Sequence, residues 1–150
     1  MKKIVVFMIF SISILFASNL KVEDGYVRAT PPSLPNSAAF MKVINSSNET
    51  VSIVKALSNV SKVVELHTHL MKDGIMKMVQ VPKIEVPANG EVSLQPGGFH
   101  IMLIGLNKAL KEGESVTLTL EFSNGESKTI TVPVKTVMDG MKHHGNHMHN

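Results

Sequence analysis

Short runs of apolar and β-branched residues, separated by clusters of Gly, Asn, Pro and Ser, dominate the chain from Val22 onward. Such runs are typical of β-strands, and at least seven of them at this spacing predict an all-β sandwich or barrel. Asp73-Gly74 and residues 123–126 predict hairpin turns, because Gly readily accepts positive φ. Only residues 107–111 suggest a short helical turn. The predicted strands are residues 38–44, 50–57, 62–70, 75–81, 100–106, 115–122 and 127–134.

The two ends of the chain depart from this pattern. Two lysines precede an apolar run over residues 4–16, and the small residues Ala17 and Ser18 follow. This order is typical of a secretory signal peptide, and the run is too short to span a bilayer comfortably, although a retained anchor is the alternative. We therefore expect a periplasmic protein without stable membrane insertion after signal cleavage. Its predicted segments are a signal peptide (1–17), one β-sandwich domain (18–137) and a His/Met-rich flexible tail (138–150).

Charge and composition narrow the classes of function. The formal net charge of +3 includes both lysines of the leader, so the exported domain is nearly neutral and shows no sign of binding nucleic acid. The chain contains ten methionines, seven histidines and no cysteine. A cysteine-linked lipoprotein is therefore not expected, and any soft-metal chemistry must use thioether sulfur.

Histidine and methionine side chains are predicted to gather on one face of neighbouring strands. Side chains two apart in a strand share a face, so His100 and Met102 project together. A two-residue loop at Asp73-Gly74 would place His69 directly opposite Met78. With that register, five potential metal ligands share one face of the hairpin: His67, His69, Met71, Met76 and Met78.

This set of donors favours monovalent copper. Thioethers are soft ligands that select Cu(I), whereas zinc usually takes thiolate or carboxylate beside its imidazoles. A purely structural alternative is that the methionines fill gaps in a β core and that His100 is a hydrogen-bonded strand histidine.

The spacing of four of these residues resembles a known motif. His67, Met78, His100 and Met102 follow the pattern H-x10-M-x21-H-x-M, which resembles the signature of the periplasmic copper chaperone family called PCuAC. The surrounding sequences VELH, DGIMKM, LQPGGFHIMLIGL and GYVRATPPSLPNSAAFM agree with that family. The resemblance covers about residues 22–134.

The resemblance implies a cupredoxin-like Greek-key β-sandwich that holds Cu(I) through two His and two Met. Carried onto this sequence, the ligands are His67, Met78, His100 and Met102. The two-residue loop instead sets His69 opposite Met78, so either the turn is longer or bulged, or His69 is an additional or exchange ligand. The implied role is delivery of copper for assembly of the dinuclear centre of cytochrome c oxidase. Other matching positions are interpreted as structural: Arg28 as a loop anchor, Asp73 as a turn residue and Gly97-Gly98 as flexible backbone.

The tail offers a second group of metal ligands. Imidazole can take Cu(II) and thioether favours Cu(I), so a tail that mixes the two suits metal capture. A solvated tail that binds metal only adventitiously is the alternative. The secondary candidates are His143, His144, His147, Met148 and His149.

These observations favour a monomeric, exported Cu(I) carrier whose partners donate or receive copper, above all cytochrome c oxidase assembly components. A periplasmic copper buffer or resistance protein without a dedicated recipient is the alternative. An enzyme is not expected, because no Ser/His/Asp or Cys/His set is visible and no acid is placed with the cluster. An adhesion sandwich with incidental methionines would show no affinity for copper.

Overall fold

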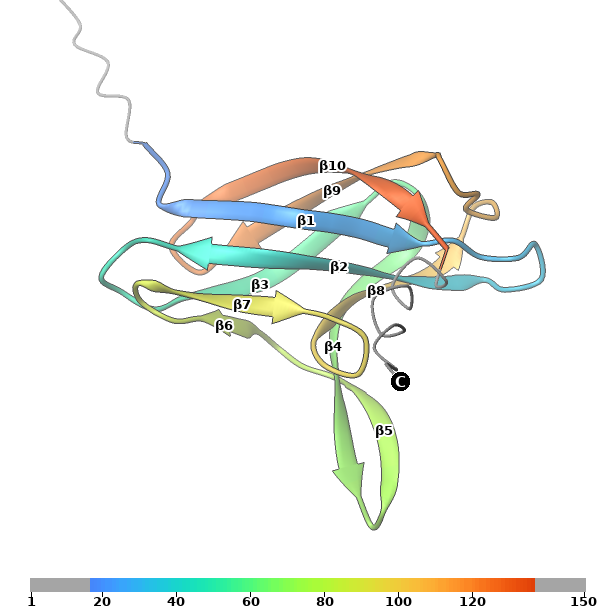
Figure 1. The fold of residues 1–150 in the computed structure, drawn as a ribbon, viewed down its shortest axis with the longest axis horizontal. Coiled ribbons are helices and arrows are strands. Elements are labelled where there is room, and N and C mark those ends of the chain that lie inside the picture. Colours follow the sequence, from blue (N-terminus) through green and yellow to red (C-terminus); the bar gives the residue numbers. More distant parts are fainter. Residues whose placement is uncertain (1–16, 137–150) are drawn as a thin grey trace, which may run out of the picture.

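Ten strands account for most of residues 17–136, the part of the chain that the computed structural model describes (Figure 1). Seven of them confirm the predicted strands to within a few residues. The strands are β1 (Leu20–Arg28), β2 (Asn36–Asn45), β3 (Val51–Ser58), β4 (Ser61–Lys72), β5 (Ile75–Gln80), β6 (Ile84–Val86), β7 (Gly90–Leu94), β8 (His100–Leu106), β9 (Ser115–Phe122) and β10 (Ser127–Lys135).

The strands form two layers that are joined along one side. One layer has the order β5-β4-β8-β2-β1, with β7 also paired to β2, and the other has the order β10-β9-β3-β6. The layers meet where β1 runs parallel to β10, with Val27 opposite Val134. The other strand pairs are antiparallel. The expected all-β sandwich is therefore confirmed.

The hydrophobic core lies between the two layers. Alternation along β9 shows how the sequence builds it, because Val116, Leu118, Leu120 and Phe122 are buried while the residues between them are more exposed. Burying one such side chain contributes about 1.5–3 kcal/mol. The corresponding buried positions of the other layer include Leu66 on β4 and many small and branched residues of β2 and β8. The opposite face of β4 and β8 is therefore free to carry polar side chains.

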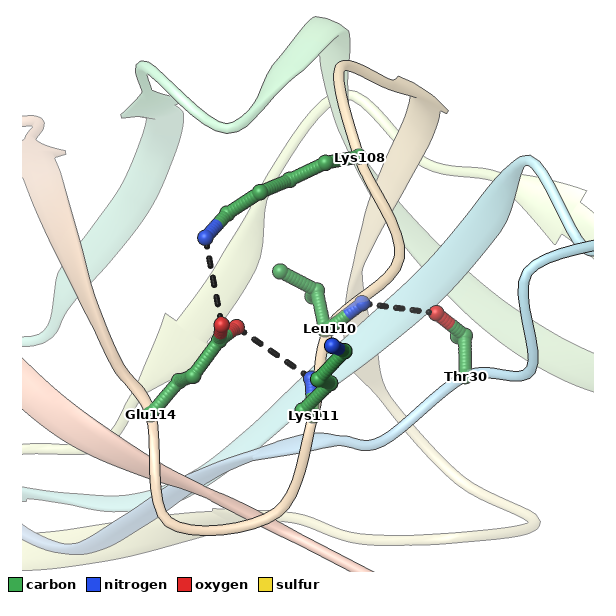
Figure 2. Close-up of polar contacts among 5 residues, drawn as sticks. All are labelled: Thr30, Lys108, Leu110, Lys111 and Glu114. Atoms are coloured by element: carbon green, nitrogen blue, oxygen red, sulfur yellow. Dashed lines mark hydrogen bonds and ion pairs between the residues drawn. The ribbon is translucent and has the colours of Figure 1, made fainter.

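The expected helical turn at residues 107–111 is wrong. This segment is an irregular connection that is fixed by specific contacts (Figure 2). The backbone N–H of Leu110 donates to Thr30 Oγ1 at 3.2 Å, and the N–H of Thr30 donates to the Leu110 carbonyl at 2.9 Å. Glu114 accepts from the Lys108 ammonium and from the Lys111 N–H. Burial of Leu110 therefore outweighs the local tendency to form a helical turn.

Strands β4 and β5 form a hairpin arm that extends away from the two layers (Figure 1). Its turn is the predicted two-residue loop, in which Asp73 (φ 53°) and Gly74 (φ 73°) both have positive φ. The predicted register is also confirmed, with His69 opposite Met78 and Met71 opposite Met76.

Within residues 17–136, no helix is long and apolar enough to cross a membrane. The predicted tail and all of the predicted signal peptide except Ala17 lie outside the described residues.

Candidate metal centre

Strands β4, β5 and β8 bring the predicted ligands to one face of the first layer. His67 lies opposite His100, and His69 lies opposite Met78. Met102 follows His100 by two residues and lies opposite Glu65 of β4. This face is the one turned away from the core, because the intervening residues of β4 and β8 belong to the core cluster. All four motif residues therefore share a face with His69.

A cavity of about 210 Å³ opens beside the base of the arm. His69, Met78 and His100 all line it, whereas His67 and Met102 lie next to these residues and are not part of its lining. The structure therefore gives His69 a more central place than the sequence spacing does. The complete lining is Arg28, Ala38, Phe40, His69, Met78, Pro96, Gly97 and His100.

His100 is almost fully buried, at 1% exposure, although it lies outside the core. The loop before β8 holds it in place. Gly97 adopts a positive φ of 85°, and the N–H of Gly98 donates to the Gln95 carbonyl at 2.9 Å. The Gly98 carbonyl then lies 3.0 Å from His100 Nδ1, which donates to it. This bond leaves the lone pair of the neutral ring on Nε2.

The surroundings keep the His100 ring neutral. Burial lowers the pKa of His100 below its ordinary value of 6.5, and the nearby His69, His67 and Arg28 lower it further, while the bond to Gly98 opposes them. A neutral imidazole has a lone pair for a metal ion, whereas an imidazolium has none.

His67 has a carboxylate partner that the sequence analysis did not anticipate. Its Nε2 lies 2.7 Å from Glu65 Oε2, so the expectation that no acid accompanies the cluster is wrong. The ring donates through Nε2, which leaves Nδ1 with the lone pair when the ring is neutral. Metal-binding histidines commonly donate their second nitrogen to a carboxylate or a backbone carbonyl. Both His67 and His100 follow this rule.

Among the residues that the structure describes, three buried ring nitrogens have no hydrogen-bond partner: His67 Nδ1, His69 Nδ1 and His100 Nε2. An unpaired buried polar atom is costly and calls for an explanation such as an ion. The three rings lie close together, with centroids 5.7 Å apart for His67 and His100 and 5.2 Å for His69 and His100. Across residues 17–136, however, no three His, Cys, Asp or Glu side chains are grouped tightly enough to hold a metal by themselves. A metal here would need thioether sulfur, which Met78 and Met102 can supply.

Arg28 and Phe40 complete one wall of the cavity. The Arg28 guanidinium lies over the Phe40 ring at 5.3 Å, and the Phe40 and His100 ring centroids are 6.2 Å apart. Within the described chain the guanidinium forms no ion pair. The Arg28 carbonyl accepts from Ser37 Oγ at 2.6 Å, and the predicted role of the Arg28 side chain as a loop anchor stays a prediction. The position of its side chain beside the histidines was not predicted.

Comparisons with solved structures agree with this fold. The copper-bound PCuAC domain from PmoF2 superimposes with a TM-score of 0.68 at 23% identity, over 81% of this chain and 97% of that domain. CuI-DR1885 from Deinococcus radiodurans gives a TM-score of 0.63 at 32% identity, over 82% of this chain and 80% of that chain. The fold is thus that of the cupredoxin-like PCuAC domains, and the expected resemblance to that family is confirmed.

Residues 20–134 match the family described as "Putative lipoprotein LpqE-like", and the chain belongs to this family. "Putative lipoprotein Lxx21020" of Leifsonia xyli subsp. xyli is 34% identical over 79% of this chain and 71% of its own length. "Uncharacterized protein RP573" of Rickettsia prowazekii is 30% identical over 66% of this chain and 55% of its own length.

Proposed function

We propose that the chain is an exported copper chaperone that carries Cu(I) at the face described above. Its ligands are drawn from His67, Met78, His100 and Met102, and His69 is a further ligand or an exchange ligand. The observation that carries the proposal is the group of three buried imidazole nitrogens beside Met78 that have no hydrogen-bond partner within residues 17–136. Neutral imidazoles with thioethers suit Cu(I) better than zinc or a hard divalent ion.

The related proteins support copper as the cargo. Structures of the PmoF2 domain and of DR1885 are described as copper-bound and Cu(I)-bound, respectively. The description "Putative lipoprotein", shared by the family and by Lxx21020, supports export of this chain as well. None of its 150 residues is a cysteine that could carry a lipid, so we propose a soluble periplasmic form released after cleavage near Ala17.

A carrier needs a site from which copper can leave. Met78 is 45% exposed and lies on the arm, whereas His100 is buried at the base. Ligands on the arm can therefore be replaced by those of a partner while the buried imidazole still holds the ion. We propose that the recipient is a component of cytochrome c oxidase assembly. A copper buffer without a dedicated recipient is the second candidate, because the predicted tail adds ligands that a carrier does not need.

Capture with the copper-loaded and the metal-free chain separates these two functions. The carrier proposal expects copper-dependent recovery of an oxidase subunit and transfer of copper to its metal-free copper domain. A Met78→Leu chain, which loses a thioether at nearly constant volume, should recover less of the subunit. Recovery of efflux components only, or of no protein, would favour the buffer.

A further inference from the structure

The outer half of the arm carries a second pair of methionines. Met71 lies directly opposite Met76, one step on the same face beyond the His69/Met78 pair. The intervening pair, Leu70 and Lys77, projects to the other face. The cavity face of the arm therefore continues outward as an unbroken row of sulfur and imidazole donors.

Packing does not explain these two methionines. Met71 is 65% exposed and Met76 is 53% exposed, and within residues 17–136 neither belongs to the core cluster nor packs against it. Methionine is common in cores because it fills irregular gaps, but these side chains fill no gap within the described residues. Their conspicuous shared property is a pair of accessible sulfur atoms.

The geometry suits a soft monovalent ion. Directly opposed residues of an antiparallel pair have Cβ atoms about 5 Å apart, and diagonal neighbours are about 7–8 Å apart. Two flexible thioethers at that separation can meet on one ion and need no deprotonation. The pair offers no oxygen or charged ligand, so a hard divalent ion has no reason to bind there.

We propose that Met71 and Met76 form an outer two-thioether site for Cu(I), separate from the cavity and one same-face residue pair further out along the arm than His69 and Met78. The inference rests on the proposed function, in which Cu(I) is the cargo. Copper would enter or leave by way of this pair. The ion would then pass between the pair and Met78, the neighbouring sulfur ligand on the same face.

The test is a titration of the full chain with Ag(I), a redox-inert soft ion, followed through the ¹³C-labelled methyl groups of methionine. The first additions should shift the Met78 methyl, and later additions should shift those of Met71 and Met76 together. The methyl of buried Met41 is an internal reference and should not move. Assignments come from single Met→Leu variants, which keep the volume and remove the sulfur.

A Met76→Leu chain decides whether the two sulfur atoms act as a pair. Its Met71 methyl should lose its response to Ag(I), while its Met78 methyl should keep it. As a control, Leu70→Met adds a thioether on the other face, opposite Lys77. The methyl signal of this added methionine should not shift when Ag(I) is added.

Three results would overturn the outer site: no Met71 response in the unmodified chain, a Met71 response that survives Met76→Leu, or loss of the Met78 response in that variant. The last result would mean one site rather than two. Failure of the proposed function would give another result. The methyl signals of Met78 and Met102 would not shift with Ag(I), even if those of Met71 and Met76 did.

Discussion

His67 on β4 lies directly opposite His100 on β8, with their ring centroids 5.7 Å apart. Each ring uses one nitrogen in a hydrogen bond, to Glu65 in the first case and to the Gly98 carbonyl in the second. The other nitrogen of each ring is buried and has no partner in the described part of the chain. When the rings are neutral, their lone pairs lie on these two nitrogens, which is the arrangement that a metal-binding histidine requires.

Removing the carboxylate beside His67 should weaken copper binding. Glu65→Ala takes away the acceptor that fixes the His67 tautomer, and loss of such a partner typically costs roughly 10- to 100-fold in metal affinity. Competition against a Cu(I) chelator measures the effect, and nitrogen NMR of the imidazole reports the tautomer. Glu85→Ala is the matched control, since Glu85 is an exposed strand carboxylate paired with Lys83 and lies outside the site. Equal affinities in the two variants would contradict a role for Glu65.

The stability of the metal-free protein should fall as the pH drops below about 6.5. Burial lowers the pKa of His100 in the folded state, so the unfolded chain takes up a proton there that the folded chain does not. The free energy of unfolding therefore decreases as the pH falls below about 6.5. It stops decreasing from this cause once the pH lies below the pKa of His100 in the folded state. Denaturant unfolding at several pH values measures this slope. His100→Leu should flatten it, and an unchanged slope would exclude His100 as its source.

Copper should stabilise the folded chain selectively. When free Cu(I) is about a thousandfold above the dissociation constant, linkage adds about 4 kcal/mol to the free energy of unfolding. Thermal melting should rise accordingly with Cu(I) and hardly change with Mg²⁺, which prefers oxygen ligands. An equal rise with both ions would point to a general ionic effect instead.

The tail and the sandwich should bind different forms of copper. The strands end at Lys135, so a truncated chain that ends at Val137 keeps all ten of them. Tail imidazoles must be neutral to bind, so Cu(II) uptake should decrease as the pH drops below about 6.5. Cu(II) uptake should also largely vanish on truncation. Binding stoichiometries at pH 7.5 and 5.5 measure both effects. Full Cu(II) uptake by the truncated chain would show that the tail is a bystander.

Local patterns in the sequence were enough to predict the arm. Asp73-Gly74 determines a two-residue turn, and period-two alternation then determines which side chains share a face. The whole β4–β5 register follows from these two rules, including the pairing of His69 with Met78. The Glu65–His67 contact was also within reach, because residues two apart on a strand share a face.

The cavity could not be predicted in the same way. Its wall depends on Arg28 of β1 and Phe40 of β2, which lie beside His100 only because β2 pairs with both β1 and β8. Such long-range pairing leaves no local signal in the sequence. The short strands β6 and β7 were missed for a related reason, since runs of three and five residues bounded by Pro and Gly carry little pattern. The connection at Leu110 was misread because only the tertiary fold buries that side chain.

The most direct test of the central claim is the Cu(I) affinity of Met78→Leu and Met102→Leu, measured by competition with a chelator in the chain truncated after Val137. Each change removes a thioether at nearly constant volume, so the fold should persist and the unfolding free energy should shift by less than about 1.5 kcal/mol. Met41→Leu is the control, because Met41 lies in the core. The account predicts that both site variants bind Cu(I) at least about tenfold more weakly than the control, a loss of about 1.4 kcal/mol. Unchanged affinity in both would contradict it and would mean that these methionines are not copper ligands.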